Sequence, residues 1–502
     1  MKKTIAILLA LVMSLGTLVS CNDIFGTDSS TDAGAESTLQ VEEGDRLAEL
    51  GSRDFEGKIF NVLDANDYPE MHVNYATEET KNSSNINEEL YRRDVQLKSS
   101  YNLGGIEYHS VTKAADGISA LSVQILADAC EYDMVISTVV GSTADGAAGG
   151  TLASLTVQGL LKNLNEIEHL SLDKEWWSPL IYENMLLNDK LYFTTGDIAP
   201  SLYQAPAAMY VNMDLFKQYH QDTDIFKIVE DGEWTIEKLL VLTEGISQDV
   251  NSDNVMNASE DFFGVVVARN GLAVQNFVVG AGSTFSKVEN NTLTMDLKSE
   301  KLGNTIELIS RLYPKTFDYG GSGSPSERQQ NVINVTFKGN NAVFLSHQLE
   351  AAMFHLRDME GDFAVLPCPK ADKDQQQYLS LVNNWCDCFV AVPSSVTDDR
   401  IDFVGFVMEA MAAYSNKNLR PFIYEKVLKY QRVNDEKSSL MVDVIMDGIV
   451  IDYAVAFDIA GIQSMVLKAT VDETPLNAQA MTKRNEINNS IKKIMIAHGI
   501  ES

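Results

Sequence analysis

The sequence predicts an α/β protein whose first sheet is built from parallel strands. Three short apolar runs, 58–64, 105–111 and 132–137, have the composition of buried strands. Two stretches with apolar residues at helical spacing separate them, namely Ile86, Leu90, Leu97 and Tyr101, then Ile118, Leu121, Ile125 and Ala129. This alternation implies parallel pairing through right-handed crossovers. Ligands of such sheets bind beyond the carboxyl ends of the strands, two of which fall at Asp64 and Ser137.

Length and charge narrow the class of protein further. The chain has 502 residues, of which 45% are apolar and 22% charged, enough for about two or three globular domains. Its 39 lysines and arginines face 71 aspartates and glutamates, a formal net charge of −32. Such a field repels nucleic-acid backbones and anionic lipid surfaces, so nucleic-acid binding is excluded. Beyond the N-terminus, no run of about 18 apolar residues predicts a membrane span.

The first 20 residues are typical of a signal peptide. Lys2 and Lys3 precede an apolar run over 4–18, and Leu-Val-Ser-Cys ends at Cys21. This arrangement resembles a bacterial lipoprotein signal, which implies a diacylglycerol on the Cys21 thiol. The mature protein is then expected to be extracytoplasmic and held on the cell membrane by its lipid anchor alone. An ordinary secretory signal with an incidental cysteine is the alternative.

A flexible tether is predicted to follow the lipidated cysteine over residues 21–54. This segment is rich in Asp, Glu, Ser, Thr, Gly and Ala and has only short apolar pieces. The folded body is therefore expected to begin near Phe55.

The four remaining cysteines are Cys130, Cys368, Cys386 and Cys388. Their spacing matches no zinc or redox motif, and they are few for a secreted chain of this size. We predict buried free thiols, with a bridge from Cys368 to one of the pair at 386 and 388 as the alternative.

A series of short segments resembles one known family. In chain order it comprises the cysteine at 21, a first strand ending at Asp64, INEELYRRD (86–94), YDMVIS (132–137), LLKNL (160–164), MYVNMDLF (209–216), GEWT (232–235), FKGNNAVF (337–344) and FAVLPCPK (363–370). Each segment alone is weakly specific, whereas their order and spacing are more so. From Cys21 to about Ile451, the chain is similar to the family 1 extracellular solute-binding proteins of bacterial ABC importers, which are maltose-binding-protein-like.

The resemblance implies a type II periplasmic-binding-protein fold, with two α/β lobes and a ligand cleft between them. Three crossing segments are placed near 207–210, 366–369 and 414–421. The first lobe is then assigned to 55–208 and 369–414, and the second lobe to 209–367 and 420–502. The function implied is capture of a sugar or oligosaccharide and its delivery to the permease subunits of an ABC importer, by a monomer without catalytic activity.

Sugar clefts need flat aromatic surfaces together with planar polar groups. Positions that the family uses carry both kinds of side chain here: Asp64, Asn66, Tyr68, Ser137, Thr138, Trp177, Tyr203, Gln204, Ser346, His347, Gln348, Asn384 and Trp385. The alternative for each is an ordinary cap, loop or core role, and Trp176 and Trp177 could instead cover a core edge. We interpret Trp234 as packing behind the helix cap Thr235, so the carbohydrate hypothesis depends most on Trp385.

One local motif predicts a metal site. Oxygen-bearing side chains occupy positions 1, 3, 5, 9 and 12 of a twelve-residue loop, as in an EF-hand, and a backbone carbonyl occupies position 7. The six ligands would be Asp249, Asn251, Asp253, Val255, Asn257 and Glu260. Position 6 holds Asn254 instead of the usual glycine, and Asp261 is an alternative last ligand. The site would hold a structural calcium ion remote from the sugar, with a solvated acidic turn as the alternative and no cofactor required.

Two other functions remain open at the level of sequence. A secreted glycoside hydrolase needs two carboxyl groups about 5 to 10 Å apart across its cleft, and no local motif singles out such a pair. A surface protein that uses the same fold for sensing or adhesion is the second alternative.

Overall fold

The structure is a computed structural model that describes residues 46–140, 150–313, 331–429 and 436–500. The predicted signal peptide, Cys21 and the tether as far as residue 45 lie outside the described residues. Among the helices that are described, none is both long and apolar enough to cross a membrane.

The folded body begins before the predicted start at residue 55. A short helix, α1 (Arg46–Glu49), lies inside the segment predicted to be a tether. Its Leu47 is buried, and the Leu47 carbonyl accepts a hydrogen bond from the Tyr101 hydroxyl at 3.1 Å. The tether therefore ends earlier than its composition suggested.

The first sheet confirms the predicted parallel strands. Strand β1 (Ile59–Ala65) pairs in parallel with β2 (Gly105–Val111) and β3 (Met134–Ser137), and β11 (Phe389–Ala391) joins antiparallel to β3. The strand order is β11-β3-β1-β2. Helices α2 (Asn85–Tyr101) and α3 (Ala114–Leu126) form the crossovers, and α3 ends before Ala129. The other elements around this sheet, which we call the first lobe, are η1 (Lys81–Ser83), α4 (Leu152–Val157), η2 (Leu164–Glu166), α5 (Pro179–Met185), η3 (Pro200–Gln204) and α12 (Asp398–Tyr414).

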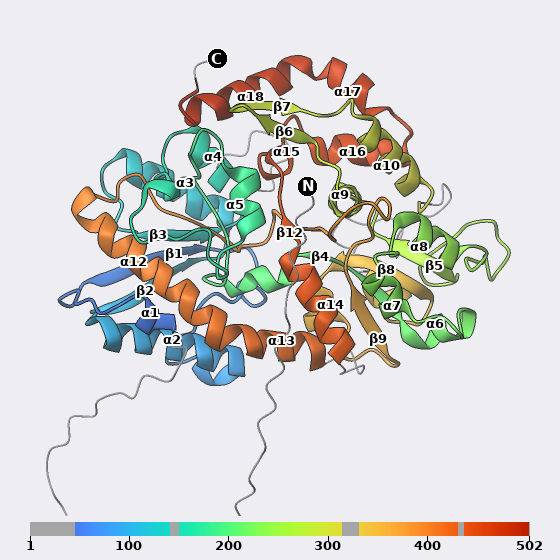
Figure 1. Ribbon diagram of the computed structural model, residues 1–502, viewed down its shortest axis with the longest axis horizontal. Coiled ribbons are helices and arrows are strands. Elements are labelled where there is room, and N and C mark those ends of the chain that lie inside the picture. The colour runs from blue at the N-terminus through green and yellow to red at the C-terminus, as the bar shows by residue number, and fades with distance from the viewer. Residues whose placement is uncertain (1–45, 141–149, 314–330, 430–435, 501–502) are drawn as a thin grey trace, which may run out of the picture. The chain divides into compact units, whose positions relative to one another are not determined.

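A second sheet, of order β5-β8-β4-β9, forms the centre of the second lobe. Strand β4 (Ala207–Asn212) runs antiparallel to both β8 (Ala342–Gln348) and β9 (Phe363–Leu366), whereas β5 (Phe263–Val267) is parallel to β8. The remaining elements before β9 are α6 (Met213–Tyr219), α7 (Ile225–Glu230), α8 (Ile236–Thr243), α9 (Gly271–Gly280), β6 (Ser286–Glu289), β7 (Thr292–Met295), α10 (Glu300–Ser310), η4 (Val332–Phe337) and η5 (Ala351–His355). Figure 1 shows the first sheet at the left and the second at the right.

The packing role predicted for Trp234 is confirmed. The Thr235 side chain caps α8 by accepting from the Lys238 amide. Trp234 is fully buried, its ring stacks on Phe344 of β8, and its indole donates to the Pro367 carbonyl at 2.8 Å. One aromatic side chain thus fastens α8 to the second sheet.

The chain returns to the first lobe later than the sequence suggested. Tyr378 donates to the Val229 carbonyl at 2.9 Å, so the segment after β9 still packs on the second lobe. The two lobes are joined where the Asn383 amide donates to the Ala205 carbonyl at 2.9 Å. The return therefore lies near residues 382 and 383 rather than the predicted 366–369.

Helix α12 is held on the first sheet by an ion pair between the partly exposed Arg400 and the buried Asp133. Arg400 donates to Asp133 at 2.7 Å and to the Ile59 carbonyl at 2.6 Å, and Asp133 also accepts from the Asn61 amide. From α12 the chain continues through η6 (Ser415–Leu419) into α13 (Arg420–Lys429), along the lower edge of Figure 1.

The C-terminal segment contacts both lobes. It contains α14 (Glu436–Asp447), β12 (Ile449–Val450), α15 (Tyr453–Ala456), α16 (Ile462–Val471), α17 (Leu476–Thr482) and α18 (Arg484–Ala497), and β12 pairs with β10 (Ser380–Leu381). Tyr192 of the first lobe donates to the Ala497 carbonyl at 2.6 Å, and Asn188 donates to the His498 carbonyl at 2.9 Å. The predicted second lobe therefore extends across the first at its C-terminal end.

Candidate functional site

A cavity of about 330 Å³ lies where the two lobes meet. The first lobe supplies the loop after β1, the start of α2 and part of η3, whereas η5 and α13 supply the opposite wall. Its lining residues are Pro69, Glu70, Met71, Val73, Thr80, Ser83, Ser84, Ile86, Asn87, Pro200, Gln204, Met353, Phe354 and Ile423. This mixture of polar and apolar groups, supplied by both lobes, suits a ligand with hydroxyl edges and apolar faces. We call it the interlobe cavity.

Other hollows are also present, and two of them are larger than the interlobe cavity. One of about 410 Å³ also lies between the lobes, and its walls include Trp177, Tyr203, Arg420 and Met446. A hollow of about 460 Å³ runs along α8, and only the second lobe lines it. Since closure on a ligand needs walls from both lobes, the hollow along α8 is the least suited of the three to a ligand site.

The loop after β1 is fixed by its own polar side chains. Asn66 donates to the His72 carbonyl at 2.7 Å, and its carbonyl oxygen accepts from the Tyr68 amide at 2.8 Å. Gln204 of η3 donates to the Met71 carbonyl at 2.7 Å. The structure therefore brings three predicted site residues, Asn66, Tyr68 and Gln204, together around this loop.

Asp387 anchors the same loop from behind. Its Oδ2 accepts from His72 Nδ1 at 2.9 Å and from the Asp67 amide at 3.2 Å. Its backbone carbonyl accepts from Asn74 Nδ2 at 2.9 Å and from the Ser201 hydroxyl at 2.8 Å. Three contacts thus tie the segment before β11 to the loop after β1, and a fourth ties it to η3.

Carboxyl groups gather at this point. Burial, reinforced by the charge of Asp387, raises the pKa of Asp64 to about 7. Burial also raises the pKa of Asp387, which the hydrogen bond from His72 partly offsets, and it raises the pKa of Glu350 in the second lobe. We call Asp64, Asp67, Asp387 and Glu350 the carboxylate cluster.

Tyr68 shows that the cluster spans both lobes. Its side chain is 54% exposed, and its ring meets His72 edge to face. Partial burial raises the pKa of the Tyr68 phenol, and the charges of Asp67, Asp387 and Glu350 raise it further. An aromatic ring that is both accessible and surrounded by carboxyl groups is suited to contact a polar ligand.

Ser137, Thr138 and Asn384 form a second group on the first lobe. The Ser137 hydroxyl donates to the Ala65 carbonyl at 2.9 Å. Asn384 donates to the Val455 carbonyl at 2.8 Å, and its backbone carbonyl lies within hydrogen-bond distance of the Thr138 hydroxyl. All three predicted residues are buried, while the adjacent Trp385 is partly exposed.

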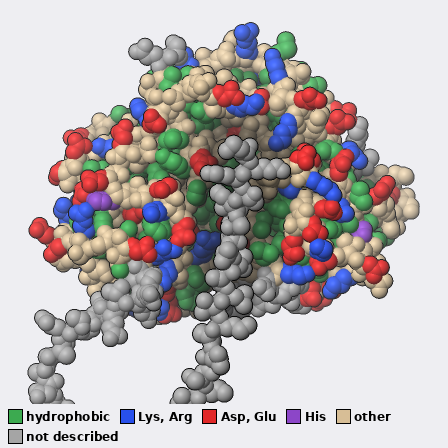
Figure 2. Space-filling model, viewed as in Figure 1, with side chains coloured by type: hydrophobic (Ala, Val, Ile, Leu, Met, Phe, Trp, Pro, Cys, Tyr) green, Lys and Arg blue, Asp and Glu red, His purple; other side chains and the backbone are tan. Residues whose placement is uncertain are grey.

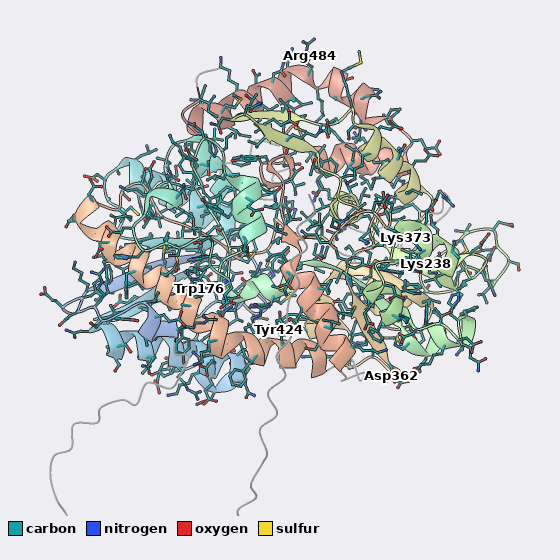
Figure 3. The ribbon with its side chains drawn as sticks, viewed as in Figure 1. Trp176, Lys238, Asp362, Lys373, Tyr424 and Arg484 are labelled. Atoms are coloured by element: carbon teal, nitrogen blue, oxygen red, sulfur yellow. The ribbon has the colours of Figure 1, made fainter. Side chains whose placement is uncertain are left out.

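Trp177 and Tyr203 lie in a different environment, near the third crossing. The indoles of Trp176 and Trp177 donate to the two oxygens of Glu409 on α12, at 3.0 and 2.8 Å. The Tyr203 hydroxyl donates to Asp197, which also accepts from Asn416 at 2.7 Å. Figure 3 labels Trp176 beside α12 and Tyr424 on α13. The structure thus separates this pair from the loop after β1.

Ser346, His347 and Gln348 belong to β8, which continues beyond the FKGNNAVF segment to Gln348. They pair with Met209, Ala208 and Ala207 of β4. All three are buried, and burial beside His355 lowers the pKa of His347 to about 3. His347 is therefore a neutral group inside the second sheet at neutral pH.

Four residues of the site have no signal in the sequence. His72, Asn74, Asp387 and Glu350 all contribute to the junction, yet none belongs to a motif. Asp387 lies between two cysteines in an apolar stretch, and such a buried acid is the one feature that could have drawn attention to it.

The predicted calcium loop is an exposed turn closed by its first residue. Asp249 Oδ1 accepts from the Ser252 amide at 2.7 Å, and Oδ2 accepts from the Asn254 amide at 2.8 Å. Asn254 has a φ of +66°, the conformation that usually favours glycine at this position. Asp261 is buried and accepts from the Val250 amide at 2.9 Å, so it fastens the ends of the loop together.

Polar side chains of the loop converge on Glu260. Its Oε2 accepts from the amides of Asn251 and Asn257, at 3.1 and 2.6 Å, and Asn251 also donates to Asp253 at 3.2 Å. Val255, at position 7, is 49% exposed. Positions 3, 5, 9 and 12 therefore meet, as a cation site would require.

One other group of side chains has the donor atoms of a metal site in the described part of the chain. Glu168, His169 and Asp402 place one donor atom each within 4.8 Å of one another. Arg53 lies 3.1 Å from His169 Nε2, and its positive charge disfavours a cation there.

All four cysteines predicted to be free are free thiols in the structure, and only Cys130 is not fully buried. Burial raises the pKa of the Cys368 thiol to about 12. Cys386 and Cys388 precede β11 instead of lying within it. The alternative of a bridge from Cys368 is wrong.

Comparison with known proteins identifies the fold. No protein-family model matches the sequence, and no curated protein matches it. Among solved structures, the cyclic alpha-maltosyl-1,6-maltose binding protein from Arthrobacter globiformis aligns with a TM-score of 0.52 and 11% identity, over 87% of this chain and 99% of that chain.

The galacto-N-biose-/lacto-N-biose I-binding protein of the ABC transporter from Bifidobacterium longum, in complex with lacto-N-biose, is equally similar. Its TM-score is 0.52 at 12% identity, over 88% of this chain and 98% of that chain. At such identities the likeness concerns the fold alone. The chain therefore has the predicted two-lobed α/β fold of type II periplasmic binding proteins.

Asp64 makes stability depend on pH. Its carboxyl has a pKa of about 7 in the folded protein against 3.8 ordinarily, so the folded state binds the proton more tightly than the unfolded chain does. The resulting stabilisation, up to about 4 kcal/mol, is present below pH 4 and is lost as the pH rises through 7. We expect Asp64→Asn to reduce the loss of melting temperature between pH 5 and pH 7.5. The exposed Asp116→Asn serves as the control, and an unchanged pH dependence in Asp64→Asn would contradict the assignment.

Proposed function

We propose that this protein is an extracytoplasmic solute-binding protein that captures a sugar or oligosaccharide between its lobes and delivers it to an ABC importer. The observation that carries this proposal is a cavity walled by both lobes in a fold shared with solved sugar-binding proteins. Membership of the solute-binding family, suggested by the order of segments in the sequence, is part of the proposal.

The crossing segments suit a receptor that closes on its ligand. At their centre, the Leu349 and Asn383 amides donate to consecutive carbonyls, those of Pro206 and Ala205, both at 2.9 Å. The proline ring fixes the backbone angle φ of its own residue. Any hinge motion therefore has to occur by rotation about the backbone bonds of a few neighbouring residues. Closure would change the relative position of the two lobes, which a permease could detect.

The site favours binding over glycoside hydrolysis. A hydrolase needs two carboxyl groups that flank the scissile bond, with room for water between them. Asp64 is 2% exposed, and Asp387 is buried and bonded to His72 on the same lobe. Both belong to the first lobe and are buried, so this pair does not flank a substrate held between the lobes. We therefore favour a binding protein over a hydrolase, and no specific observation favours the sensing or adhesion alternative.

The distribution of charged side chains on the surface does not resemble that of a nucleic-acid-binding protein. Figure 2 shows acidic and basic side chains interspersed over the described part of the face in view, without an extended basic patch there. Together with the net charge of −32, this leaves a small solute and the importer as the proposed partners of a monomer.

The proposed lipid anchor rests on the residues around Cys21. Lysines 2 and 3, the apolar run over 4–18 and the cysteine after Leu-Val-Ser form a lipoprotein signal. Several acyl chains together would hold the protein at the membrane far longer than one.

The proposed calcium site rests on the loop from Asp249 to Glu260. Its side chains already meet at Glu260, and rotation of the Asn251 and Asn257 amides would turn their oxygens toward a cation. The ion would close an exposed turn, so its role is structural.

Ligand binding should stabilise the purified protein. A sugar at 100 times its Kd adds about 2.7 kcal/mol to the free energy of unfolding, which thermal shift measures. We expect a response within a panel of maltose-type oligosaccharides and lacto-N-biose-type disaccharides, with the sugar recovered unchanged. Ser83→Trp at the cavity wall should weaken the response, whereas Asn82→Trp, next to it outside the cavity, should not. Release of a shortened glycan would contradict the proposal.

The anchor is tested by replacing the modified residue. In a bacterial host, Cys21→Ser should abolish incorporation of labelled palmitate and move the protein from the membrane fraction to the soluble one. Cys130→Ser removes a cysteine elsewhere and should leave both unchanged. Labelling that persists in Cys21→Ser would disprove lipidation at this residue.

Calcium should raise the melting temperature of the protein, and a chelator should reverse the change. Asp253→Asn combined with Glu260→Gln removes two carboxylate ligands and should abolish the response, because calcium binds hard charged oxygens. Glu244→Gln, exposed in the same lobe outside the loop, is the matched control. Identical titration curves for the double variant and the control would exclude calcium from this loop.

A further inference from the structure

The C-terminal segment holds the two lobes together at a place away from the interlobe cavity. Helix α16 packs against the second lobe, and the end of α18 reaches the first lobe, along the upper edge of Figure 1. Helices α2 and α13, which line the cavity, lie along the lower edge of the same view. Among the described residues of 449–500, none lines the cavity. This segment therefore joins the lobes without forming part of the proposed sugar site.

Adjacent residues at the start of α15 bond to different lobes. Asp452 accepts from the Phe285 and Ser286 amides of the second lobe, at 2.7 and 3.0 Å. Tyr453 donates to the Met185 carbonyl of the first lobe at 2.7 Å. Because the two bonding residues are neighbours in the chain, a change in the angle between the lobes has to strain or break one of these contacts.

Helix α16 is fitted closely to the second lobe. It crosses the start of α9, where a Cβ on Gly271 would lie 2.1 Å from the Gln463 carbonyl oxygen. Glycine allows such a close approach of two backbones, because it has no side chain. Arg269 and Asp472 add an ion pair of 3.5 Å at the other end of α16. We therefore expect this part of the segment to move with the second lobe.

The first lobe binds the end of α18 through two side chains. Tyr192 donates to the Ala497 carbonyl at 2.6 Å, and Asn188 donates to the His498 carbonyl at 2.9 Å. The His498 ring is buried and meets the Tyr192 ring edge to face, with 5.0 Å between the ring centroids. The last carbonyls of a helix have no partner within it, so the first lobe supplies the donors that the end of α18 needs.

A rotation of one lobe against the other acts on all of these contacts. The bonds donated by Tyr192, Asn188 and Tyr453 have lengths between 2.6 and 2.9 Å. A displacement of about 1 Å is enough to break them, because a hydrogen bond is lost beyond about 3.5 Å. The three bonds join the same segment to the same lobe, so they resist the rotation together.

We propose that α15 to α18 form a clasp that restricts how far the lobes open when no sugar is bound. This inference rests on the proposed function and concerns the regulation of its site. A receptor that samples fewer widely open arrangements spends more of its time in the arrangement that binds, and its apparent affinity rises accordingly. The clasp therefore acts on affinity from outside the cavity.

Distances between the lobes test the clasp directly. Spin labels are placed at Asp116→Cys on α3 and at Lys217→Cys on α6, both of which are exposed positions. The full mature chain carries Cys21→Ser and Cys130→Ser, and the three other thiols are buried and stay unlabelled. Pulsed EPR then measures the distribution of distances between the lobes in the sugar-free protein.

Removal of the clasp bonds should broaden that distribution. Asn188→Ala combined with Tyr192→Phe deletes the two bonds to the end of α18, and Tyr453→Phe, which loses a single hydroxyl, should act in the same direction. The matched control, Tyr182→Phe combined with Asn184→Ala, deletes one tyrosine bond and one asparagine bond within the first lobe and should keep the wild-type distribution. Melting curves confirm that each variant folds. Clasp variants with the same distribution as the control overturn the inference.

Calorimetry connects the clasp to binding. The probe is the sugar that gives the largest thermal shift among the maltose-type and lacto-N-biose-type sugars. The double clasp variant should bind it at least about threefold more weakly than the wild type does, and the control should bind it equally well. Equal or tighter binding by the clasp variant contradicts the proposed effect on affinity. If no sugar binds, the proposed function fails, whereas the EPR distances still decide whether the clasp restricts the lobes.

Discussion

The contact between Asp387 and the loop after β1 fixes the wall that the first lobe presents to the second. Asp387 approaches from the segment that returns to the first sheet, and it bonds to His72, Asp67, Asn74 and Ser201. Because Ser201 lies in η3, three stretches far apart in the chain share one buried residue. The position of the loop, and hence of the interlobe cavity, follows from this contact.

A second polar network acts at the third crossing. Asp197 accepts from the Tyr203 hydroxyl and from Asn416, and burial raises its pKa to about 6. Arg93, fully buried in α2, donates to Ser415 at 3.3 Å. The first residues of η6 are thus fixed to the first lobe. If the chain bends at this crossing when the lobes move, the bend would lie after Asn416. Rigid ends with a short deformable segment between them are the requirement for a hinge.

The helices and strands could be predicted from the sequence because the interactions that form them involve residues close together in the chain. The run over 105–111 is strand β2 without any shift of boundary, and the apolar stripe that includes Ile86 and Leu97 became the buried face of α2. The cap of α8 and the packing of Trp234 also followed from neighbours in sequence. Hydrophobic periodicity and capping need only a few adjacent residues, so a single chain is sufficient to detect them.

The junction could not be predicted in the same way. His72 and Asp387 are 315 positions apart, and only the complete fold brings them together. The predicted residues Asp64, Asn66 and Gln204 were found from their places at the ends of strands and crossings, whereas Glu350 has no local signature. The late return at residue 383 also escaped detection, because it depends on long-range contacts such as that between Tyr378 and Val229, which leave no local pattern in the segment after β9.

Destabilising groups at the junction would suit the proposed receptor, which opens and closes around its ligand. Each uncompensated carboxyl group raises the free energy of the closed, empty state, whereas exposure to water in an open state relieves it. A ligand that supplies hydrogen-bond donors removes the same penalty and so favours closure with the ligand inside. In the proposed receptor, the polar junction would therefore couple closure to occupancy. An apolar junction of the same shape would close without a ligand, and closure would then give the proposed permease no information about occupancy.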